Sequence, residues 1–337
     1  MIIHNAYGVD LGTSQIKVFS QASGQTLTEN NMIAIRNGEE VIAVGNDAWE
    51  MYERTPANIT VAQPVRGGRI ADVAQVEYVM RTMLRRIDRQ TGYAPIVYFS
   101  VPVNMSEIEK RAYYAMSHAG YLRSPKVFLV DRAICDAVAM GIPLSKTRGS
   151  MIVNMGGEST GISVIANEQV IISKDIPIGG RQLNEAICDM IRRQENLLVG
   201  HRTAKRLKAV IATLGEDIHE ERSVFGMDTL SGLPREASVT SGTVCRAVRG
   251  QISQLAEEIR VFLERTPPQI RESVNRDGIY LSGGTARIPY IDRYLKKHIG
   301  CNVNLPNYYE MCTIRGLEEI IRHKALHKWA YTIGKKK

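Results

Sequence analysis

The chain opens with short apolar runs that are separated by Gly, Ser and Asn residues, in AYGVDLGTSQIKVFSQASGQTLTENNMIAI. This pattern predicts a β-hairpin followed by a third strand. The period then changes to that of an amphipathic helix after Ala71 and Asp72, which can cap its first turn. The apolar positions at helical spacing are Val73, Val76, Val79, Met80, Met83, Leu84 and Ile87.

Strands and helices alternate in the next part of the chain. The apolar runs PIVYFSVP (95–102) and KVFLVD (126–131) are typical of buried strands. Between them, SEIEKRAYYAMSHAGY predicts a helix with a capping box from Ser106 to Glu109. RAICDAVAMG predicts a further helix that ends at Gly141, and the polar link SKTRG follows it. The alternation indicates parallel strand pairing, with a domain boundary near residue 145.

The second half of the chain repeats the design of the first. MIVNMGGESTGISVI (151–165) resembles YGVDLGTSQIKVFS: each has an apolar strand, a polar residue at its end, a glycine turn and a returning strand. The repeat predicts duplicated α/β domains with a ligand cleft between them. Further expected elements are helices near 181–194, 203–213 and 243–265, a polar β-like insertion at 219–241, a strand at 278–284, and a helix near 315–326 that returns to the first domain through Leu317, Ile320 and Ile321.

Composition excludes several classes of protein. The net charge of +8 is compatible with an anionic partner, but the basic residues are scattered and the chain has only five Phe and two Trp, so no nucleic acid is expected as a partner. The five cysteines form no CxxC pair, which favours a reducing cytosol over a disulfide framework or a zinc site. No stretch approaches the ~18 apolar residues of a membrane span, and the N-terminus lacks an export signal.

Glycine turns carry the candidate chemistry. Successive backbone N–H groups in such a turn can hold phosphate oxygens, and glycine permits the close approach that this requires. In the first turn the candidate cradle is Gly12, Thr13 and Ser14. Lys17 is placed to reach a phosphate, and Asp10 is placed to orient a hydrated Mg2+.

Two further turns extend this pattern. The segment from Gly156 to Thr160 is a matching cradle, and the segment from Ser282 to Thr285 follows an apolar strand and suits an adenine or a ribose. No GxxxxGK[ST] motif is present and no GxGxxG motif follows a strand, which disfavours Walker-type and Rossmann sites. Three such turns in this order on an α/β scaffold indicate a nucleotide-binding protein of a different class.

The chain resembles the MreB-like bacterial actins, the rod shape-determining proteins of the superfamily that also contains actin, heat-shock chaperones and sugar kinases. The likeness extends from about Gly8 to about Gly316. TPANI, GGRIAD and SGLPR are not nucleotide loops, so shared nucleotide chemistry alone does not explain it. The segments that carry the likeness are GVDLGTSQIKVF, VGNDAWEMYERTPANITVAQPVRGGRIAD, SVPVNMSEIEKRAYYAMSHAGYLRSPKVFLVD, VGHRTAKRLK, LSGLPREASVTSGTVCRAV, ERTPPQI and GIYLSGGTARIPYID.

The resemblance implies an actin-like two-lobed ATPase fold of the α/β class. Duplicated mixed β-sheets with helices on both faces and two small inserted subdomains are expected. The first lobe would span 1–145 with an insertion at about 33–66, and the second 146–314 with an insertion at about 181–242. Residues 315–337 would supply a helix that returns to the first lobe and a basic tail. ATP with Mg2+ is expected in the interlobe cleft.

The resemblance also implies partners and a location. The protein is expected in the cytoplasm, peripherally at the inner face of the cell membrane, where it would polymerise head to tail with itself or with a related bacterial actin. Membrane-bound wall-synthesis proteins would be its partners in cell shape determination. The expected membrane contact is Tyr93, in the loop DRQTGYAPIV. One such anchor is marginal, but many anchors act together in a filament.

Site residues follow from the resemblance position by position. They comprise a first phosphate loop, a second phosphate loop, an adenosine turn and a segment that lines the base. The implied residues are Asp10, Gly12, Thr13 and Ser14 in the first loop, Gly156, Gly157 and Ser159 in the second, Gly283, Gly284 and Thr285 in the adenosine turn, and Lys208 beside the base.

Two departures from the family pattern bear on hydrolysis. Members generally read Asp-Ile-Gly-Gly-Gly-Thr where this chain reads NMGGES (154–159), so that Asn154 replaces a metal-facing carboxylate and Glu158 replaces a glycine beside the phosphates. Members also read Glu-Glu-Pro where this chain has Asp131, Arg132 and Ala133. An arginine does not act as a base at neutral pH.

Slow or absent hydrolysis is therefore the leading hypothesis. Asp131 and Glu158 are the remaining candidate catalytic acids, Asn154 is a candidate metal ligand through water, and Arg132 is a candidate partner of the γ-phosphate or of Glu158. The alternative is a pseudo-ATPase paralogue that copolymerises with or regulates an active bacterial actin. A sugar or metabolite kinase on the same fold is disfavoured, because no substrate-binding acid stands out and TPANI, SGLPR and TPPQI match the filament family.

Overall fold

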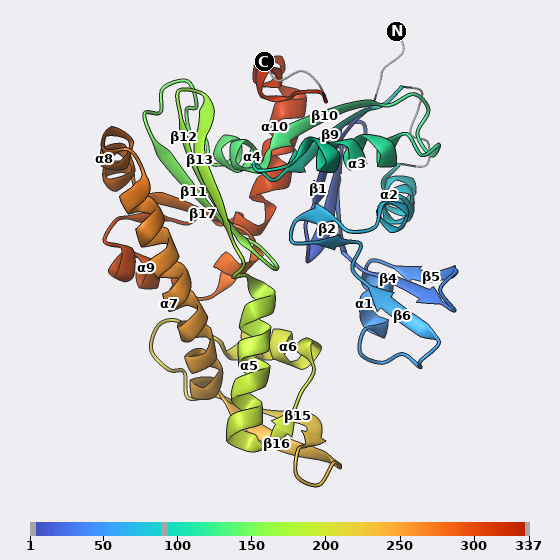
Figure 1. Cartoon of the computed structure of the whole chain (residues 1–337), viewed down its shortest axis with the longest axis vertical. Helices are drawn as coiled ribbons and strands as arrows, with labels where there is room; N and C mark the ends of the chain where they lie inside the picture. Colours follow the sequence, from blue (N-terminus) through green and yellow to red (C-terminus); the bar gives the residue numbers. More distant parts are fainter. Residues whose placement is uncertain (1–4, 89–93, 334–337) are drawn as a thin grey trace. The chain divides into compact units, whose positions relative to one another are not determined.

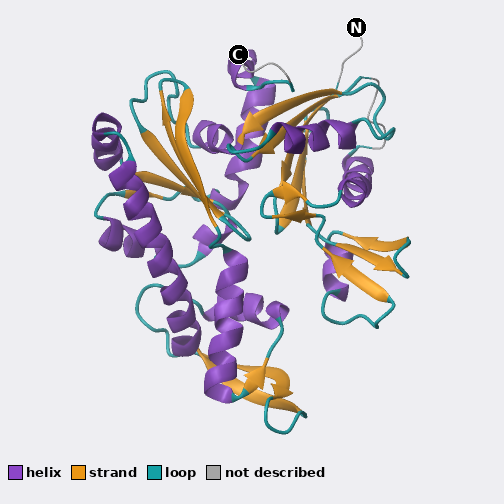
Figure 2. Cartoon of the chain, viewed as in Figure 1, coloured by secondary structure: helices purple, strands orange, loops and turns teal. Residues whose placement is uncertain are grey.

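The computed structural model describes residues 5–88 and 94–333, which form two compact units. The first unit comprises the described residues of Met1–Thr147, Ile165–Lys174 and Met311–Lys337. The second comprises Arg148–Val164 and Asp175–Glu310. Each unit combines a large mixed sheet with helices and a smaller sheet (Figures 1 and 2). The predicted α/β class is confirmed.

The large sheet of the first unit has the strand order β10-β9-β1-β2-β3. Antiparallel pairing joins β1 to β2 and β2 to β3, and parallel pairing joins β1 to β9 and β9 to β10. The predicted hairpin, third strand and parallel strands are thus confirmed. The strands are β1 (Ala6–Leu11), β2 (Gln15–Ser20), β3 (Thr26–Asn30), β9 (Ile96–Val101) and β10 (Lys126–Asp131).

The helices of this unit begin where their caps predict. Asp72 Oδ1 accepts a hydrogen bond from Gln75 N at 2.9 Å, and Ser106 and Glu109 form the expected capping box. The apolar face of the first long helix lies in one buried core with the strands. The helices are α2 (Val73–Ile87), α3 (Glu107–Ser117), α4 (Arg132–Ala139) and α10 (Cys312–Arg322), followed by a 3-10 segment at Lys324–Trp329.

The last helix, α10, packs against α4 and β1, and its residues Leu317, Ile320 and Ile321 are buried as predicted. Gly316 lies in the contact with α4. A Cβ at that position would lie 2.7 Å from Cys135 Cα, and closer still to the carbonyl group of Cys135. The two helix backbones therefore touch at a point that only glycine accommodates.

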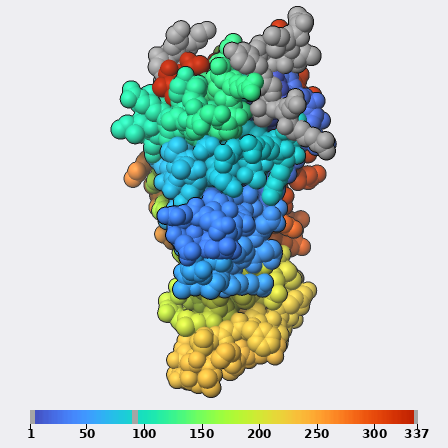
Figure 3. Space-filling model, turned by 90° about the vertical axis from the view of Figure 1, so that its right-hand side faces the viewer, coloured from blue at the N-terminus to red at the C-terminus, as the bar shows by residue number. Residues whose placement is uncertain are grey.

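A small sheet with the order β5-β4-β6 and the short helix α1 belong to the same unit, and their surface is blue in Figure 3. Ala34 and Ala48 are fully buried there, with Trp49 and Tyr52 packed against them. A two-stranded ribbon follows. The elements are β4 (Ile33–Arg36), β5 (Glu40–Val44), α1 (Asn46–Met51), β6 (Ile59–Ala62), β7 (Val65–Arg66) and β8 (Arg69–Ile70).

The second large sheet repeats the topology of the first, with the order β13-β12-β11-β17-β18. In each sheet the first strand is central, the next two strands along the chain lie on one side, and two later strands lie on the other. The pairs β11 with β17 and β17 with β18 are parallel, which confirms the predicted duplication. The strands are β11 (Ser150–Met155), β12 (Thr160–Ala166), β13 (Gln169–Ile176), β17 (Ile279–Ser282) and β18 (Val303–Asn304).

The remaining elements of the second unit include three predicted helices and the predicted β insertion, together with two short helices, α8 and α9, that were not predicted. Among the described residues, no helix is both long and apolar enough to cross a membrane. The elements are α5 (Gly180–Glu195), β14 (Leu197–Leu198), α6 (His201–Ile211), β15 (Glu221–Asp228), β16 (Pro234–Thr240), α7 (Ser241–Arg265), α8 (Pro268–Asp277), a 3-10 turn at Gly284–Arg287, α9 (Ile291–Ile299) and a 3-10 turn at Tyr309–Met311.

Candidate functional site

The first predicted phosphate turn joins β1 to β2. A Cβ at Gly12 would lie 2.6 Å from Gln15 O, so the turn closes in a space that requires glycine. Thr13 is buried, and its Oγ1 accepts a hydrogen bond from Gly68 N at 2.9 Å. The Ser14 side chain is exposed. The turn is therefore fixed on one side by the β7–β8 ribbon and open to solvent at Ser14.

The Asp10 carboxylate, at the end of β1, lies between positive charges. Ser100 Oγ donates a hydrogen bond to Asp10 Oδ1 at 2.6 Å. Lys17, the cross-strand partner of Asp10, places Nζ 3.9 Å from Oδ2, and Arg132 places Nη2 3.6 Å from Oδ1. One buried carboxylate thus faces two cations, and the cluster carries a net positive charge.

This cluster does not fit a divalent cation at Asp10. Mg2+ is usually held by one or two carboxylates together with phosphate oxygens and water. Cations at 3.6 and 3.9 Å repel a metal ion there, and Asn154, in the second unit, offers a neutral amide. The predicted metal-orienting role of Asp10 is not supported.

Arg132 is the first residue of α4 and retains unused hydrogen-bonding capacity. Its side chain is 21% exposed, but the Nη2 atom is buried and has no hydrogen-bond partner in the described part of the chain. Burial lowers the pKa of Arg132, and the attraction of Asp10, with smaller effects from Tyr113 and Asp136, outweighs burial and raises that pKa overall. The guanidinium is therefore charged and oriented by Asp10 without being hydrogen-bonded to it.

The second predicted phosphate turn, between β11 and β12, has the same local geometry as the first. A Cβ at Gly156 would lie 2.8 Å from Ser159 O, which corresponds to the relation between Gly12 and Gln15. Gly156 O accepts hydrogen bonds from Gly180 N at 3.1 Å and from Thr285 Oγ1 at 2.8 Å. The turn is thereby attached both to the start of α5 and to the third turn.

Glu158 is directed toward α5. It accepts a hydrogen bond from Arg181 Nη1 at 2.7 Å, and this bond is the largest contribution to the raised pKa of Arg181. The Glu158 side chain is 13% exposed, so its charge lies near the turn but is compensated. Asn154 lies opposite Ser282 in the β11–β17 register, and its Oδ1 is 3.9 Å from the position that a Gly156 Cβ would take.

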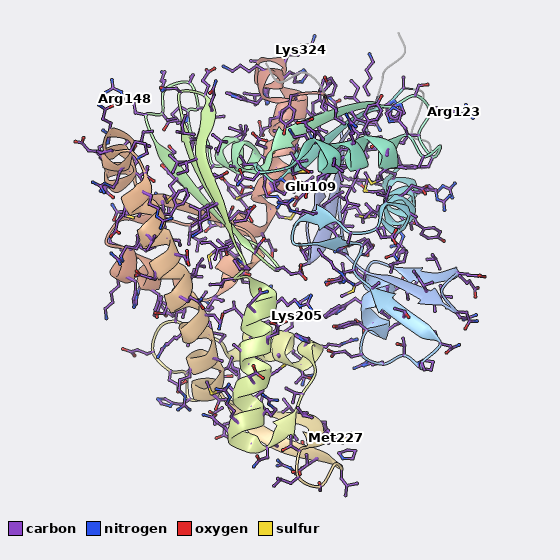
Figure 4. All side chains as sticks on the ribbon, viewed as in Figure 1. Glu109, Arg123, Arg148, Lys205, Met227 and Lys324 are labelled. Atoms are coloured by element: carbon purple, nitrogen blue, oxygen red, sulfur yellow. The ribbon has the colours of Figure 1, made fainter. Side chains whose placement is uncertain are left out.

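The third turn, Gly283 to Thr285, and Lys208 lie near the second phosphate turn, within the second unit. Gly283 has φ +88°, and a Cβ there would lie 2.8 Å from Met155 N, whereas a Cβ at Gly284 would meet nothing within 4 Å. Lys208 Nζ donates a hydrogen bond to Gly180 O at 2.6 Å. Burial, together with the neighbouring charge of Lys205 (labelled in Figure 4), lowers the pKa of Lys208 to about 7. Gly284 thus presents open space beside Thr285, which is directly linked to the second phosphate turn.

Comparison with known proteins agrees with this arrangement. The profile of the family described as MreB/Mbl protein matches residues 4–328. The chain belongs to the MreB/Mbl family. It is 30% identical to the cell shape-determining protein MreB of Escherichia coli strain K12, over 93% of this chain and 92% of that protein. It is 31% identical to the cell shape-determining protein Mbl of Bacillus subtilis strain 168, over 87% of this chain and 88% of that protein.

Solved structures show that this MreB/Mbl protein has the actin-like fold. The crystal structure of MreB5 of Spiroplasma citri bound to AMPPNP matches with a TM-score of 0.91 and 25% identity, covering 97% of this chain and 98% of that one. A MamK double helical filament matches with a TM-score of 0.77 and 18% identity, covering 95% and 99% respectively. The predicted actin-like class with duplicated sheets is therefore confirmed.

The remaining predicted residues of this MreB/Mbl protein lie in other surroundings. Asp131, a candidate catalytic acid, accepts a hydrogen bond from Tyr331 Oη at 3.0 Å, beside the bridge between Leu129 and Tyr331. This contact ties β10 to the C-terminal segment of the first unit, and it supports a structural role for Asp131. Tyr93, the expected membrane anchor, lies outside the described residues.

Sequence reasoning missed three residues that shape these turns. Ser100 is a polar residue within the apolar strand PIVYFSVP, and its position there could have predicted a buried hydrogen bond, which it makes to Asp10. Arg181 follows two glycines at the start of α5, where no motif marks it as the partner of Glu158. Gly179 packs so closely that a Cβ would lie 2.7 Å from Ser159 N, and this tertiary contact has no local signature.

Proposed function

We propose that this MreB/Mbl protein is a cytoskeletal ATP-binding protein that assembles into filaments and takes part in cell shape determination. The observation that carries the proposal is the matched pair of glycine turns, at Gly12 and Gly156, each closing on the carbonyl oxygen three residues later. Thr285 donates a hydrogen bond to Gly156 O in the second turn, and Lys208 donates one to Gly180 O at the start of α5. The relatives named as cell shape-determining proteins and the AMPPNP complex of MreB5 support the same function.

The first test is direct binding of ATP to the purified chain, measured by isothermal titration calorimetry. Micromolar binding that Gly156→Val abolishes would support the proposal, because the valine side chain collides with Ser159 O and fills the turn. Gly250→Val serves as a control for glycine replacement away from the turns, since Gly250 is exposed on α7 and nothing lies within 4 Å of a Cβ there. Failure of the wild-type chain to bind ATP would refute the proposal.

Hydrolysis is proposed to be slow or absent. Arg132 stands where the family pattern has an acid, and it lies beside Asp10. Asp131 accepts a hydrogen bond from Tyr331, and Glu158 forms an ion pair with Arg181. No acid among these is positioned as an evident base for water. Single-turnover hydrolysis of bound ATP tests this proposal, and a rate comparable with that of an ordinary bacterial actin would contradict it.

Self-assembly is proposed to use a set of exposed apolar side chains on the small sheet of the second unit. Large apolar side chains rarely gather at the surface of a monomer without a partner. Met227, labelled in Figure 4, lies on this sheet, and the proposed partner is a second copy of the chain. The hairpin patch consists of Leu198, Phe225, Met227, Leu230 and Leu233, of which Leu230 is 83% and Phe225 72% exposed.

The proposed place of action is the inner face of the cell membrane, where the filament would organise wall-synthesis proteins. Family membership supports this location. Co-sedimentation of the polymerised chain with vesicles that contain anionic lipid tests it, with unpolymerised chain as the comparison, because filament avidity should strengthen attachment. If the chain pellets alone but never with vesicles, a soluble filament is the better description.

The second candidate function is a pseudo-ATPase that copolymerises with an active bacterial actin. Arg132 favours it, because this cation stands where the family pattern has an acid and lies beside Asp10 near the first turn. Sedimentation of the chain alone and in a mixture with an active MreB distinguishes the two. Pelleting only in the mixture would support the pseudo-ATPase.

A further inference from the structure

We propose that Arg132 is a phosphate-binding residue that allows this chain to hold a nucleoside triphosphate without Mg2+. The inference rests on the proposed nucleotide binding and adds a residue and a metal requirement to it. Three observations within the first unit carry it: the charge around Asp10, the unused hydrogen-bonding capacity of Arg132, and the position of its guanidinium beside the first turn.

The charge of the cluster favours an anion over a cation. Asp10 contributes one negative charge, while Lys17 at 3.9 Å and Arg132 at 3.6 Å contribute two positive charges. Ser100 Oγ already donates to Asp10 Oδ1. These three groups, of which Lys17 and Arg132 each lie within 4 Å of Asp10, therefore have one positive charge in excess, and the side chains of Asp10 and Lys17 are each only 9% exposed. The buried Asp136 acts more weakly on Arg132 than Asp10 does. Burial strengthens the attraction for phosphate and the repulsion of Mg2+.

The protein leaves part of the hydrogen-bonding capacity of the Arg132 guanidinium unused, and the side chain is 21% exposed. Its separation of 3.6 Å from Asp10 exceeds hydrogen-bonding distance, and Nη2 has no hydrogen-bond partner in the described part of the chain. A buried donor without a partner is costly, so a site that supplies an acceptor is favoured. A planar guanidinium matches phosphate oxygens in two parallel hydrogen bonds, which a compact ammonium group does not.

Gly68 places this guanidinium at the first turn. Gly68 N donates a hydrogen bond to Thr13 Oγ1 at 2.9 Å, and Arg132 Nη1 lies 3.5 Å from the position that a Gly68 Cβ would take. Thr13 of the first turn and Arg132 thus both lie beside Gly68. A phosphate bound at the turn lies within reach of a cation that the protein supplies, so the charge that Mg2+ ordinarily provides is already present.

The competing explanation is that Arg132 only neutralises Asp10. Both explanations predict that loss of Arg132 changes stability, so stability does not separate them. They differ in the effect of metal on binding. A phosphate-binding Arg132 makes ATP affinity nearly independent of Mg2+, whereas a purely structural Arg132 leaves the usual requirement for metal.

The experiment is calorimetric titration of the full chain with ATP, in excess Mg2+ and in excess EDTA, for wild type, Arg132→Gln and Arg132→Lys. The control is Arg36→Gln, which removes an exposed arginine paired with Glu40 in the same unit. For wild type and the control we expect affinities in the two conditions within roughly threefold of each other. Arg132→Gln should weaken binding in EDTA by about 10- to 100-fold, the range for a lost charge-assisted hydrogen bond, and Arg132→Lys should recover part of it.

A wild-type affinity that falls more than about 30-fold in EDTA would overturn the inference while leaving nucleotide binding intact. Equal EDTA affinities for wild type and Arg132→Gln would overturn it as well, provided that circular dichroism shows the variant folded. If Arg132→Gln does not fold, the wild-type comparison between Mg2+ and EDTA still decides. No binding of wild type in either condition refutes the proposed function itself, and with it this inference.

Discussion

The contact between α10 and α4 gives the sharpest structural prediction. Gly316 lies in the interior of α10, and a Cβ added there would lie 2.7 Å from Cys135 Cα and closer to the Cys135 carbonyl group. All of the nearest atoms belong to the backbone of α4, so no side chain can rotate to make room. Gly316→Ala should therefore force α10 and α4 apart. Because α10 also packs on β1, the change should disturb the core of the first unit.

The expected magnitude combines two opposing effects. Alanine favours a helix interior over glycine by about 1 kcal/mol, which stabilises α10. Overpacking in a close-packed core typically costs ~1–3 kcal/mol, and a collision with rigid backbone lies at the upper end of that range. The expected net loss in free energy of unfolding is about 2 kcal/mol. For a unit of this size that loss corresponds to a fall in Tm of ~4–8 °C.

The assay is thermal and urea unfolding followed by circular dichroism, with Gly250→Ala as the matched control. Gly250 is exposed in the interior of α7, and a Cβ there would meet nothing within 4 Å. The same substitution should therefore raise stability by ~0.5–1 kcal/mol in the control. If Gly316→Ala proved as stable as Gly250→Ala, the argument from helix contact would be refuted.

Three further outcomes are expected. Between the lowered pKa of Lys208, about 7, and its ordinary value of 10.5, the unfolded chain binds more protons than the folded chain, so the free energy of unfolding should rise with pH. In urea unfolding, the free energy of unfolding of wild type should therefore rise from about pH 7 to about pH 10 relative to that of Lys208→Met. A difference between the two proteins that does not change with pH would contradict the assignment. Arg181→Gln leaves the charge of Glu158 uncompensated beside the second turn and should weaken ATP binding by about two- to fivefold in calorimetry, while the double variant with Glu158→Gln should recover it. Replacement of both Leu230 and Leu233 by serine should reduce the pelleted fraction in sedimentation without changing the circular dichroism spectrum, and unchanged pelleting would exclude the hairpin patch as an assembly surface.

Elements with strong local signals could be predicted from the sequence. Asp72 and Ser106 cap α2 and α3 as expected, because capping depends on residues three positions apart. The repeated strand-turn-strand pattern predicted the duplicated sheets, because each strand and turn is also encoded by neighbouring residues. The short helix α8 carries only two large apolar residues, Ile270 and Val274, so local periodicity indicated it weakly. In α9 the apolar residues Ile291, Leu295 and Ile299 do recur at helical spacing, but this helix was not predicted.

The candidate site could be predicted less completely. The glycine turns were recognisable because their backbone conformation excludes other residues, as at Gly12 and Gly156. The ion pairs were not, because Arg132 with Asp10 and Glu158 with Arg181 join residues that are far apart in sequence. Of the two partners predicted for Arg132, Glu158 is paired with Arg181 instead, while the γ-phosphate stays a proposal; within the protein Arg132 lies beside Asp10. Pairing depends on the sheet and helix packing, which a linear pattern does not contain.

The departures from the family pattern act on turnover and binding in different ways. Phosphate binding at a glycine turn uses backbone N–H groups, which depend on chain conformation and not on side-chain charge. The turns at Gly12 and Gly156 keep this conformation. Positioning of water requires an acid, and here Arg132 and Asn154 replace acids, while the added charge of Glu158 is compensated by Arg181. If the turns bind phosphate as proposed, these replacements would add positive charge beside them, which would favour an anion, and would leave no acid where the family pattern has its base. If the chain also assembles as proposed, slow hydrolysis would keep it loaded with nucleotide, and filament turnover would depend on nucleotide release instead of hydrolysis.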